Sequence, residues 1–481
     1  MTIEKNNNSF IDLLLINPPN MDHSPINLFS LFLHKLVNYF PPGLLYLAAN
    51  VKRNGYKVKI YDMELNYNIK KLLKFIKSEK PKIIGITALS FSYLNALKTL
   101  RIIKNRFPKV VTIIGGIHIS KNPTDAIKRN YVDYELLGEA DFTLVELLNY
   151  VLKKKGKIND IEGLVYINHE KIIQNPGFPI VEELNSLPYP ALELLDNKRY
   201  YISFQKYHPS SIIMGSRGCP FQCIFCDKLT NKLRLRTPEN IISEIKFMYR
   251  NYKIRDFQFY DLTFNADRNW VKDICSKLIE ENLPIAWRCT SRVELMDDQL
   301  VKLMKKAGCY LIALGVESGN NNSLKFLKKG FKVKDIIKAF KLTKKYNLET
   351  HAYYIVGIPG EDKKAFLKTI KLIKSIAPDY INSLTLRPYP HTELAKISKE
   401  KGWFDFSNIN FLKPDFKYQN KLTLLFDEMS PEEIIKMQRY GFISYYLNIN
   451  YILRIIFKLV KEPRRFFFNI WKIFIELLKK F

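Results

Sequence analysis

Three cysteines near the middle of the chain are the residues best placed to carry chemistry. Cys219, Cys223 and Cys226 are separated by three and then two residues. Thiolates at this spacing can bind one 4Fe–4S cluster from a single loop, and because such a cluster wants four ligands, one iron is left open. An open iron is useful only if a substrate or a cofactor binds it. Zinc is the alternative, but a structural zinc site closes with four ligands, and no nearby Cys or His completes it unless His208 does.

The stretch that contains these cysteines, residues 218–226, resembles the signature of the radical S-adenosylmethionine (SAM) superfamily, including Phe225 just before the third cysteine. The resemblance implies that the open iron binds the amino and carboxylate groups of SAM. One electron from the cluster would then break a sulfur–carbon bond, which gives methionine and a 5′-deoxyadenosyl radical. It also implies an external one-electron reductant of the flavodoxin or ferredoxin type, and a site that shields the radical from water.

Four later segments, each after an expected strand, resemble other parts of the family's SAM site. Tyr260-Asp261 matches the place where the family contacts the methionine amino group, and residues 315–319 match a segment near the ribose and carboxylate. Residues 357–361 are similar to the family's Gly-Leu-Pro-Gly-Glu turn near the adenine. Each segment alone is weak, because such a turn ends many helices and a charged residue can form a simple ion pair. The residues assigned to SAM are Phe225, Tyr260, Asp261, Ser291, Arg292, Glu317, Ser318, Gly357 and Pro359.

The elements that must position these residues alternate between strands and Lys- and Leu-rich helices over residues 205–400. Apolar runs predict six strands, at residues 211–215, 256–260, 286–290, 310–316, 350–356 and 380–386. Six strand–helix repeats predict a partial (β/α)6 TIM-like barrel, here a radical SAM barrel, short of the eight repeats of a closed barrel. Chemistry in such barrels lies at the carboxyl ends of the strands, which is where the SAM residues fall.

Residues 9–150 show an earlier strand–helix alternation. Short apolar runs predict strands at 11–17, 58–61, 83–87, 110–114 and 134–137, with one helix from residue 42 to about residue 54 and another at 96–105. Apolar strands separated by helices indicate a parallel sheet covered on both faces, in a doubly wound, Rossmann-like α/β domain. Ligands of such sheets bind at the carboxyl ends of the strands, where Asn17, Thr87, Gly115 and Gly138 lie.

Short motifs in this half resemble the cobalamin-binding domain that precedes the barrel in one large subgroup of the family. The glycines at 115 and 116 suit a flat aromatic base, because such a base can slide between strand and helix only where side chains are absent. A tight turn, or another ligand of a doubly wound sheet, would explain the same pattern. The residues assigned to cobalamin are Asn17, Pro18, Pro19, Thr87, Leu89, Ser90, Gly115, Gly116, His118, Gly138 and Glu139.

Three positions depart from these patterns. Cobalamin-dependent mutases place a histidine on cobalt with an Asp-x-His-x-x-Gly motif, whereas residues 22–25 here are Asp-His-Ser-Pro. His23 and His118 are therefore not assigned as cobalt ligands. Residues 140–141 are Ala-Asp where Gly-Glu is usual, and His391 replaces the glycine of a Pro-x-Pro-Gly-Thr turn, which we expect to reshape the substrate side of the barrel.

Two further regions flank the barrel. Residues 151–204 contain Lys-rich turns, prolines and an apparent hairpin near residues 165–174, and they are predicted as a structured linker. Residues 401–481 are predicted as a helical C-terminal region, helical from about residue 430, in which residues 440–457 and 465–481 combine aromatics, isoleucine and Lys or Arg. This region is either a cap whose aromatics are core, or an interfacial helix on a membrane. In the second interpretation the lipid-facing residues are Phe466, Phe467, Phe468 and Trp471, and the head-group contacts are Arg464, Arg465 and Lys472.

Composition sets broader limits. A chain of 481 residues, 47% of them hydrophobic, is expected to form two or three domains. The formal charge of +29 comes largely from Lys spread along the whole chain, which is typical of a solvated surface, and no nucleic-acid partner is expected.

Six unevenly placed cysteines do not suit a disulfide framework. With no apolar signal core and no run long enough to cross a bilayer, we expect a cytoplasmic protein, with peripheral membrane contact as a hypothesis.

These features lead to three functional hypotheses. The first is a cobalamin-dependent radical SAM enzyme that methylates an unactivated carbon of a small-molecule or lipid substrate, with one SAM supplying methyl to cobalt and a second generating the radical. The second keeps the 4Fe–4S cluster, SAM and cobalamin but performs ring formation or another oxidative rearrangement. The third is a non-catalytic cobalamin or redox sensor, against which the cysteine trio speaks, because a sensor needs no open iron. No motif indicates the substrate.

Overall fold

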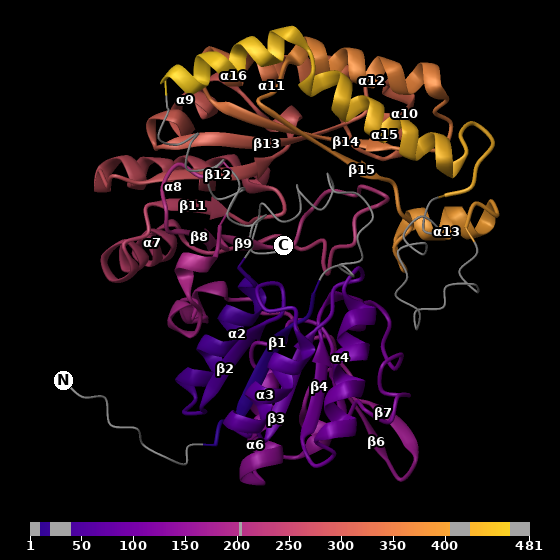
Figure 1. Ribbon diagram of the computed structural model, residues 1–481. Helices are drawn as coiled ribbons and strands as arrows, with labels where there is room; N and C mark the ends of the chain where they lie inside the picture. Colours follow the sequence, from indigo (N-terminus) through magenta and orange to yellow (C-terminus); the bar gives the residue numbers. More distant parts are fainter. Residues whose placement is uncertain (1–9, 20–39, 202–203, 405–423, 462–481) are drawn as a thin grey trace. The chain divides into compact units, whose positions relative to one another are not determined.

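The computed structural model describes residues 10–19, 40–201, 204–404 and 424–461 (Figure 1). These residues divide into two compact units, one that ends at Arg199 and one that begins at Tyr200. Each unit is built around parallel strands that are joined by helices. The predicted α/β class is therefore confirmed in both halves of the chain.

The N-terminal unit contains the doubly wound sheet that its sequence predicts. Its parallel strands lie in the order β2-β1-β3-β4-β5. Strand β1 therefore lies inside the sheet, with β2 added on one side of it and β3 to β5 on the other. All residues from Leu13 to Ile16 are buried, and because successive side chains of a strand point to opposite faces, both faces of the sheet are covered. The strands are β1 Leu13–Asn17, β2 Val58–Asp62, β3 Ile83–Thr87, β4 Val111–Gly115 and β5 Tyr134–Leu136, and the helices are α2 Pro42–Arg53, α3 Ile69–Glu79, α4 Tyr93–Arg106, α5 Ile117–Lys121 and α6 Thr143–Lys153.

An antiparallel hairpin extends this sheet beyond β5. Strand β6, Leu164–Asn168, pairs with β5, and β7, Lys171–Gln174, pairs with β6. Leu164, Val165 and Tyr166 are buried, so the hairpin adds core and also covers an edge of β5 whose backbone groups would otherwise be unpaired. The structure therefore differs from the linker predicted over residues 151–204, because the hairpin belongs to the N-terminal sheet and the compact unit continues to Arg199.

The C-terminal unit contains the predicted six parallel strands. They lie in the order β15-β14-β13-β12-β11-β8, so each strand pairs with its neighbour along the chain, as in an open (β/α)6 barrel (Figure 1). The strands are β8 Ser210–Ile213, β11 Asp256–Phe259, β12 Ala286–Ser291, β13 Cys309–Glu317, β14 Glu349–Val356 and β15 Tyr380–Thr385. The helices are α7 Pro238–Tyr252, α8 Arg268–Glu281, α9 Asp298–Lys306, α10 Asn321–Phe326, α11 Val333–Lys345, α12 Lys363–Ile376 and α13 Glu393–Glu400.

Two C-terminal helices, α15 Pro431–Tyr446 and α16 Ile449–Lys461, complete this unit. The Tyr446 hydroxyl accepts a hydrogen bond from the Ile381 amide at 3.0 Å, and the Gln438 amide donates to the Ser383 carbonyl at 3.0 Å. Side chains of α15 thus satisfy backbone groups of the last strand, β15, that no further strand pairs with. The helical structure predicted from about residue 430 is confirmed over the described residues by α15 and α16, which are separated at Leu447 and Asn448.

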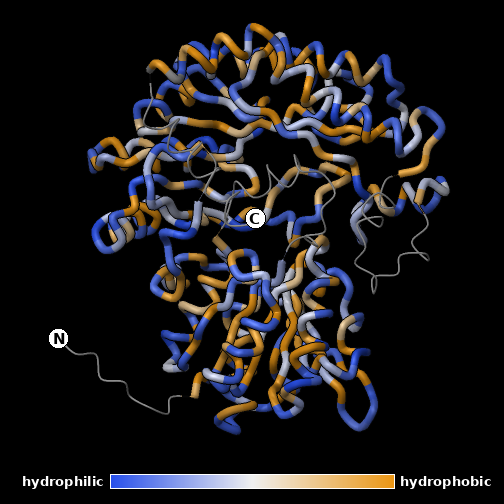
Figure 2. The backbone as a smooth tube through the Cα atoms, viewed as in Figure 1, coloured by the Kyte–Doolittle hydropathy of each residue, from blue (hydrophilic) through white to orange (hydrophobic). Residues whose placement is uncertain are grey.

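The other C-terminal predictions, the helix at 465–481 and the lipid contacts at Phe466, Phe467, Phe468, Trp471, Arg464, Arg465 and Lys472, lie outside the described residues. No helix of the described part is long and apolar enough to cross a membrane. Its helices instead alternate apolar and polar residues, which Figure 2 shows as alternating orange and blue along the tube. Such alternation is typical of helices that cover a sheet.

The turn of the β6–β7 hairpin generates a prediction about stability. His169 and Glu170 both have left-handed backbones, with φ of 45° and 64°, which Asn and Gly adopt more readily than other residues. We expect the double variant His169→Asn, Glu170→Gly to raise the unfolding free energy of the N-terminal unit by roughly 1 kcal/mol. Differential scanning calorimetry would measure this. Glu170→Ala keeps the β-carbon and should bring no gain; equal stabilisation by it would contradict the explanation.

Candidate functional site

The cysteine loop leaves the barrel after β8 and is closed at its base by a two-stranded ribbon. Strand β9, Ser216–Arg217, pairs antiparallel with β10, Arg234–Leu235, so residues 218–233 project as one loop. Gly218 has φ of 85°, and a β-carbon there would stand 2.0 Å from the Lys232 carbonyl oxygen. No other residue fits that contact, so the glycine before the first cysteine is required by the loop itself.

The three thiols of this loop have different surroundings. Cys219 is buried, with its Sγ 3.6 Å from the Thr263 hydroxyl, whereas Cys223 and Cys226 are partly exposed. Burial raises the pKa of the Cys226 thiol to about 11, and the charges of Cys223 and Cys219 add to this. Bound iron has the opposite effect, because metal ligation requires thiolates and stabilises them.

Among the residues that the structure describes, no three His, Cys, Asp or Glu side chains are arranged to hold a single metal ion. The ligands of one zinc ion must converge on one point, whereas the cysteines of a 4Fe–4S cluster each bind a different iron and need not do so. A donor set of three thiols and no fourth ligand fits the cluster better than zinc. The assignment of Cys219, Cys223 and Cys226 to it stays a prediction.

Arg292, at the end of β12, contacts the cysteine loop directly. Its Nη1 donates to Cys223 Sγ at 3.4 Å, and its guanidinium lies 3.9 Å from the ring centre of Phe221. Its Nη2 also donates to the Lys329 carbonyl, and its Nε pairs with Glu294 at 2.6 Å. Arg292 is predicted from the sequence to bind SAM. In the structure its guanidinium contacts the cysteine loop.

Asp261 carries a buried carboxylate oxygen that fits a positively charged ligand. Its Oδ1 accepts a hydrogen bond from the Ser216 hydroxyl, while Oδ2 is buried and has no hydrogen-bond partner within the described residues. Burial raises the pKa of Asp261 to about 6, although the Ser216 hydrogen bond lowers it. An ammonium group is the partner that would best satisfy Oδ2, in agreement with the predicted contact to the SAM amino group. Tyr260, beside it, is half exposed.

A second buried charge pair follows β13. Glu317 has a left-handed backbone with φ of 57°, and its Oε1 lies 2.9 Å from Lys329 Nζ. Gly315 makes room for this carboxylate, because a β-carbon there would stand 2.4 Å from Glu317 Oε1. Burial alone would lower the pKa of Lys329, but the charges of Glu317 and Cys223 raise it above its usual value. Lys329 is a site residue that the sequence analysis missed, since nothing distinguishes it among 76 Lys and Arg residues.

Several predicted SAM residues are engaged in holding loops together. The Ser318 hydroxyl donates to the buried Glu361 carboxylate at 2.5 Å, which joins the turns after β13 and β14. Gly357 has φ of 80°, and a β-carbon there would stand 2.9 Å from the side chain of Ile434 in α15. Ser291 and Pro359 are buried, and Phe225 packs against the apolar cluster around Ile224. These contacts explain the residue types without a ligand, so the SAM roles remain predictions.

His391 keeps the backbone of the glycine that it replaces. Its φ is 65°, in the left-handed region, and its side chain is exposed. The turn before α13 therefore retains its shape, at the cost of placing an imidazole where a glycine would leave space.

In the N-terminal unit, the predicted cobalamin residues gather at the carboxyl ends of β1, β3 and β4. The Asn17 amide donates to Asp62 at 2.9 Å, and the Pro19 carbonyl accepts from Asn95 at 2.8 Å. Leu89 and Phe91, which follow β3, are 37% and 50% exposed. An exposed apolar pair beside a glycine turn fits a large planar cofactor, and Phe91 was not recognised from the sequence.

The glycines of this edge have a structural reason of their own. Gly116 has φ of 111°, and a β-carbon there would stand 2.6 Å from the Ala88 carbonyl oxygen. Ala88 donates to the Gly115 carbonyl at 2.7 Å, so the turns after β3 and β4 touch through their backbones. The close contact of these two turns therefore explains Gly115 and Gly116 without a ligand. It is also compatible with a flat aromatic base of a cofactor beside them.

Other residues assigned to cobalamin have partners within the protein. The His118 ring is buried and stacks on Tyr93 with ring centres 3.9 Å apart, which suits a structural histidine rather than a cobalt ligand. A β-carbon at Gly138 would stand 2.3 Å from the Pro179 carbonyl oxygen, and the Glu139 carboxylate accepts from the Val181 amide at 2.8 Å. Gly138 and Glu139 thus anchor the segment that follows the hairpin.

Comparison with known proteins decides the family. The model of the radical SAM superfamily matches residues 213–373, and that of the B12 binding domain matches residues 36–148. An uncharacterized methyltransferase of Pyrococcus horikoshii is 30% identical over 427 residues, which cover 87% of this chain and 90% of that protein. The chain belongs to the radical SAM superfamily, in the group with a B12-binding domain.

Two further relatives agree with this membership. The anaerobic magnesium-protoporphyrin IX monomethyl ester cyclase of Rubrivivax gelatinosus is 27% identical over 91% of this chain and 79% of its own length. The solved structure of the radical SAM methyltransferase TsrM from Kitasatospora setae, with cobalamin and a 4Fe–4S cluster bound, has the same fold, with a TM-score of 0.62 and 16% identity over 82% of this chain and 76% of that one. The two family models confirm the predicted enzyme class and the predicted cofactors, the 4Fe–4S cluster, SAM and cobalamin.

The Arg292 contact generates a prediction about the cluster. A cation that donates to a cluster thiolate favours the reduced, more negative state. We expect Arg292→Gln to lower the midpoint potential by roughly 60 mV, the one-electron equivalent of a charged hydrogen bond of about 1.4 kcal/mol. A redox titration followed by electron paramagnetic resonance measures this. Arg268→Gln removes an exposed arginine paired with Asp297 and is the control. An Arg292→Gln protein with full iron content and an unchanged potential would contradict the prediction.

The raised pKa of Asp261 generates a prediction about pH. The folded state holds this proton up to about pH 6, whereas the unfolded state releases it near the ordinary aspartate pKa of 3.8. The contribution of Asp261 to stability therefore falls as pH rises from about 4 to about 6, and stays lower above. Asp261→Asn keeps the shape of the side chain without ionising. The unfolding free energy of the cofactor-free variant, relative to that of the wild type, should therefore be higher at pH 8 than at pH 4 by up to about 3 kcal/mol. The same substitution should weaken SAM binding. Denaturant unfolding and SAM titration of both proteins test this, and equal pH profiles would refute it.

Proposed function

We propose that this protein is a cobalamin-dependent radical SAM methylase that acts on an unactivated carbon of a small-molecule or lipid substrate. The observation that carries the proposal is the connection between the cysteine loop and Asp261. Ser216, at the base of the loop, bonds to Asp261, whose second oxygen is buried and available to a cationic ligand. A loop with three thiols and an adjacent partner for an ammonium group together suit SAM bound at an open iron.

Each residue of this site has a separate task in the proposal. Asp261 accepts from the SAM ammonium group, and Arg292 positions the loop through Cys223. Glu317 and Lys329 form a buried pair of opposite charges beside Phe225. Lys329 Nζ lies 5.7 Å from the centre of the Phe225 ring. When bound, the cluster supplies the electron that cleaves SAM and cobalamin carries the methyl group. The surrounding buried side chains keep water from the radical.

The support for methylation is the relationship to proteins named as methyltransferases. A second candidate function is ring formation or another oxidative rearrangement with the same cofactors, because the relative from Rubrivivax gelatinosus is named a cyclase. Both candidates need an external one-electron reductant of the flavodoxin or ferredoxin type. The sensor hypothesis has no such support from the relatives.

Product analysis separates the two candidates. Anaerobically reconstituted protein should contain about four irons and one cobalt per chain. With strong reductant and a methyl-accepting substrate, we expect S-adenosylhomocysteine and 5′-deoxyadenosine in equal amounts. Formation of 5′-deoxyadenosine alone, with product, would assign rearrangement and overturn methylation.

A matched pair of variants controls this experiment. Cys223→Ala should abolish 5′-deoxyadenosine formation and lower the iron content, because the cluster loses a ligand. Cys275→Ala removes a buried thiol from α8, outside the loop, and should retain iron and SAM cleavage. Protein that is fully loaded with iron yet never cleaves SAM would support the sensor instead.

A further inference from the structure

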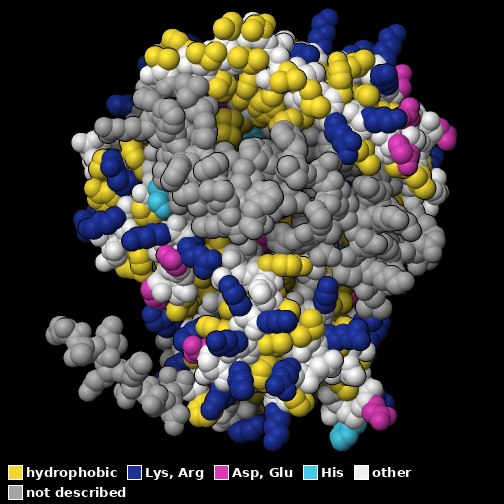
Figure 3. All heavy atoms as spheres, in the orientation of Figure 1, with side chains coloured by type: hydrophobic (Ala, Val, Ile, Leu, Met, Phe, Trp, Pro, Cys, Tyr) yellow, Lys and Arg dark blue, Asp and Glu magenta, His cyan; other side chains and the backbone are white. Residues whose placement is uncertain are grey.

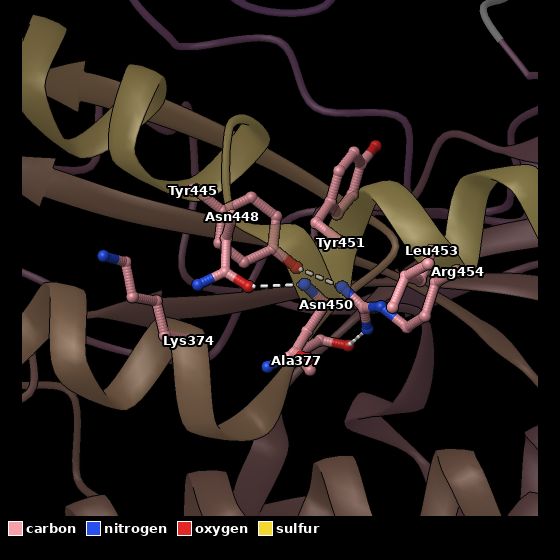
Figure 4. Close-up of a pocket in the computed structure, with 8 residues that line it drawn as sticks. All are labelled: Lys374, Ala377, Tyr445, Asn448, Asn450, Tyr451, Leu453 and Arg454. Carbon is pink, nitrogen blue, oxygen red and sulfur yellow. Dashed lines mark hydrogen bonds between the residues drawn. The ribbon is translucent and has the colours of Figure 1, made fainter.

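Helix α16 is attached to the barrel through its cations. Lys458 Nζ lies 2.7 Å from Asp379 and 3.1 Å from Glu349, at the starts of β15 and β14. Arg454 donates to the carbonyls of Ala377 and Pro378 and to the Tyr445 hydroxyl (Figure 4). A helix that covers a barrel normally turns its apolar side inward and its charges outward. Helix α16 instead turns Arg454 and Lys458 toward the barrel, together with the partly buried Tyr451 and Ile455.

The apolar side of α16 consequently faces outward. Its residues recur at helical spacing, and all of them are exposed, from 38% at Ile452 to 76% at Val460. We call them the outer stripe: Ile449, Ile452, Leu453, Ile456 and Val460. Ile443 of α15 and Leu447, which follows that helix, are 53% and 71% exposed and continue the same apolar surface. Figure 3 shows apolar side chains gathered over these two helices.

Cations lie beside the outer stripe on the side of α12. Helix α12 carries five Lys and no acidic residue, α11 carries five Lys and one Asp, and α16 itself has no acidic residue. Lys374 of α12 and Leu453 and Arg454 of α16 line a recess of about 360 Å³ beside the stripe (Figure 4). An apolar stripe bordered by Lys and Arg is the pattern of helices that lie in the interface of an anionic bilayer.

We propose that the outer stripe of α16 docks onto an anionic lipid surface. A second copy of the chain would bring the same positive charge to the contact, and residues 462–481 carry five Lys or Arg against two Glu. Either occupant would meet like charge around the stripe, whereas acidic lipid head groups complement it. The inference rests on the described residues of α16 and is independent of the chemistry proposed for the barrel.

Vesicle co-sedimentation of the full-length holoprotein tests the proposal. The wild type should bind vesicles of phosphatidylglycerol and phosphatidylcholine at low salt, and bind phosphatidylcholine alone much more weakly. The double variant Ile452→Ser, Ile456→Ser should bind the anionic vesicles at least about tenfold more weakly, because two apolar side chains no longer enter the lipid. Lys374→Gln should weaken binding about fivefold, the effect expected of one cation near the membrane surface.

The matched control is Ile167→Ser, Ile172→Ser, which replaces two exposed isoleucines of the β6–β7 hairpin. Its vesicle affinity should equal that of the wild type, and circular dichroism should show all variants folded. Unchanged binding of the outer-stripe variant, or equal wild-type binding to neutral and anionic vesicles, would overturn the proposal. So would a wild-type oligomer that the outer-stripe substitutions convert to monomer without any vesicle binding, because the occupant would then be a second copy.

Discussion

One interaction ties the candidate site of the barrel to the end of β12, the contact of the Arg292 guanidinium with the cysteine loop. Residues 218–233 contain no helix or strand, and within the loop the Lys228 ammonium donates to the Cys219 and Phe221 carbonyls and the Cys226 amide to the Cys223 carbonyl. Arg292 adds the link to distant segments: it joins the end of β12 to the cysteine loop, through Cys223 and Phe221, and to the Lys329 carbonyl. A buried guanidinium is tolerated only where such partners satisfy it, and Glu294 balances its charge. The same group that organises the loop therefore also sets the charge around it.

Both units use the carboxyl ends of parallel strands, but the residues found there serve packing as well as binding. Gly116 and Gly357 are glycines because a β-carbon would strike Ala88 and Ile434, and Ser318 is a serine that bonds to Glu361. Asp261 also has a carboxylate oxygen, Oδ2, that is buried without a hydrogen-bond partner among the described residues, a property that it shares with Glu361 Oε2 and Glu294 Oε2. Such an oxygen is costly without a ligand, and Asp261 lies against the base of the cysteine loop through its bond with Ser216.

The two C-terminal helices pack against the barrel in opposite ways. Helix α15 buries Gly441 against the Tyr354 hydroxyl and covers the backbone of β15, so the open end of the sheet is closed by side chains rather than by another strand. Helix α16 forms ion pairs with the barrel through Lys458, and the residues of its outer stripe remain exposed. Helix α15 thus completes the core, whereas α16 is held on the barrel with an apolar surface exposed.

The sequence by itself determined the positions of the strands, the six-strand barrel, the doubly wound sheet and the cysteine loop, because these follow from local periodicity and from spacing within a few residues. It did not indicate that the β6–β7 hairpin joins the N-terminal sheet, since strand pairing depends on the unpaired edge of β5 and not on the hairpin's own residues. Lys329 and the outward apolar face of α16 could not be recognised from the sequence either. Lys329 matters because Glu317 and Arg292 come to lie beside it, and Lys458 of α16 pairs with Asp379 and Glu349, about 80 and 110 residues earlier in the chain. Only the tertiary structure decides such features, because burial and charge pairing arise between segments that the sequence keeps apart.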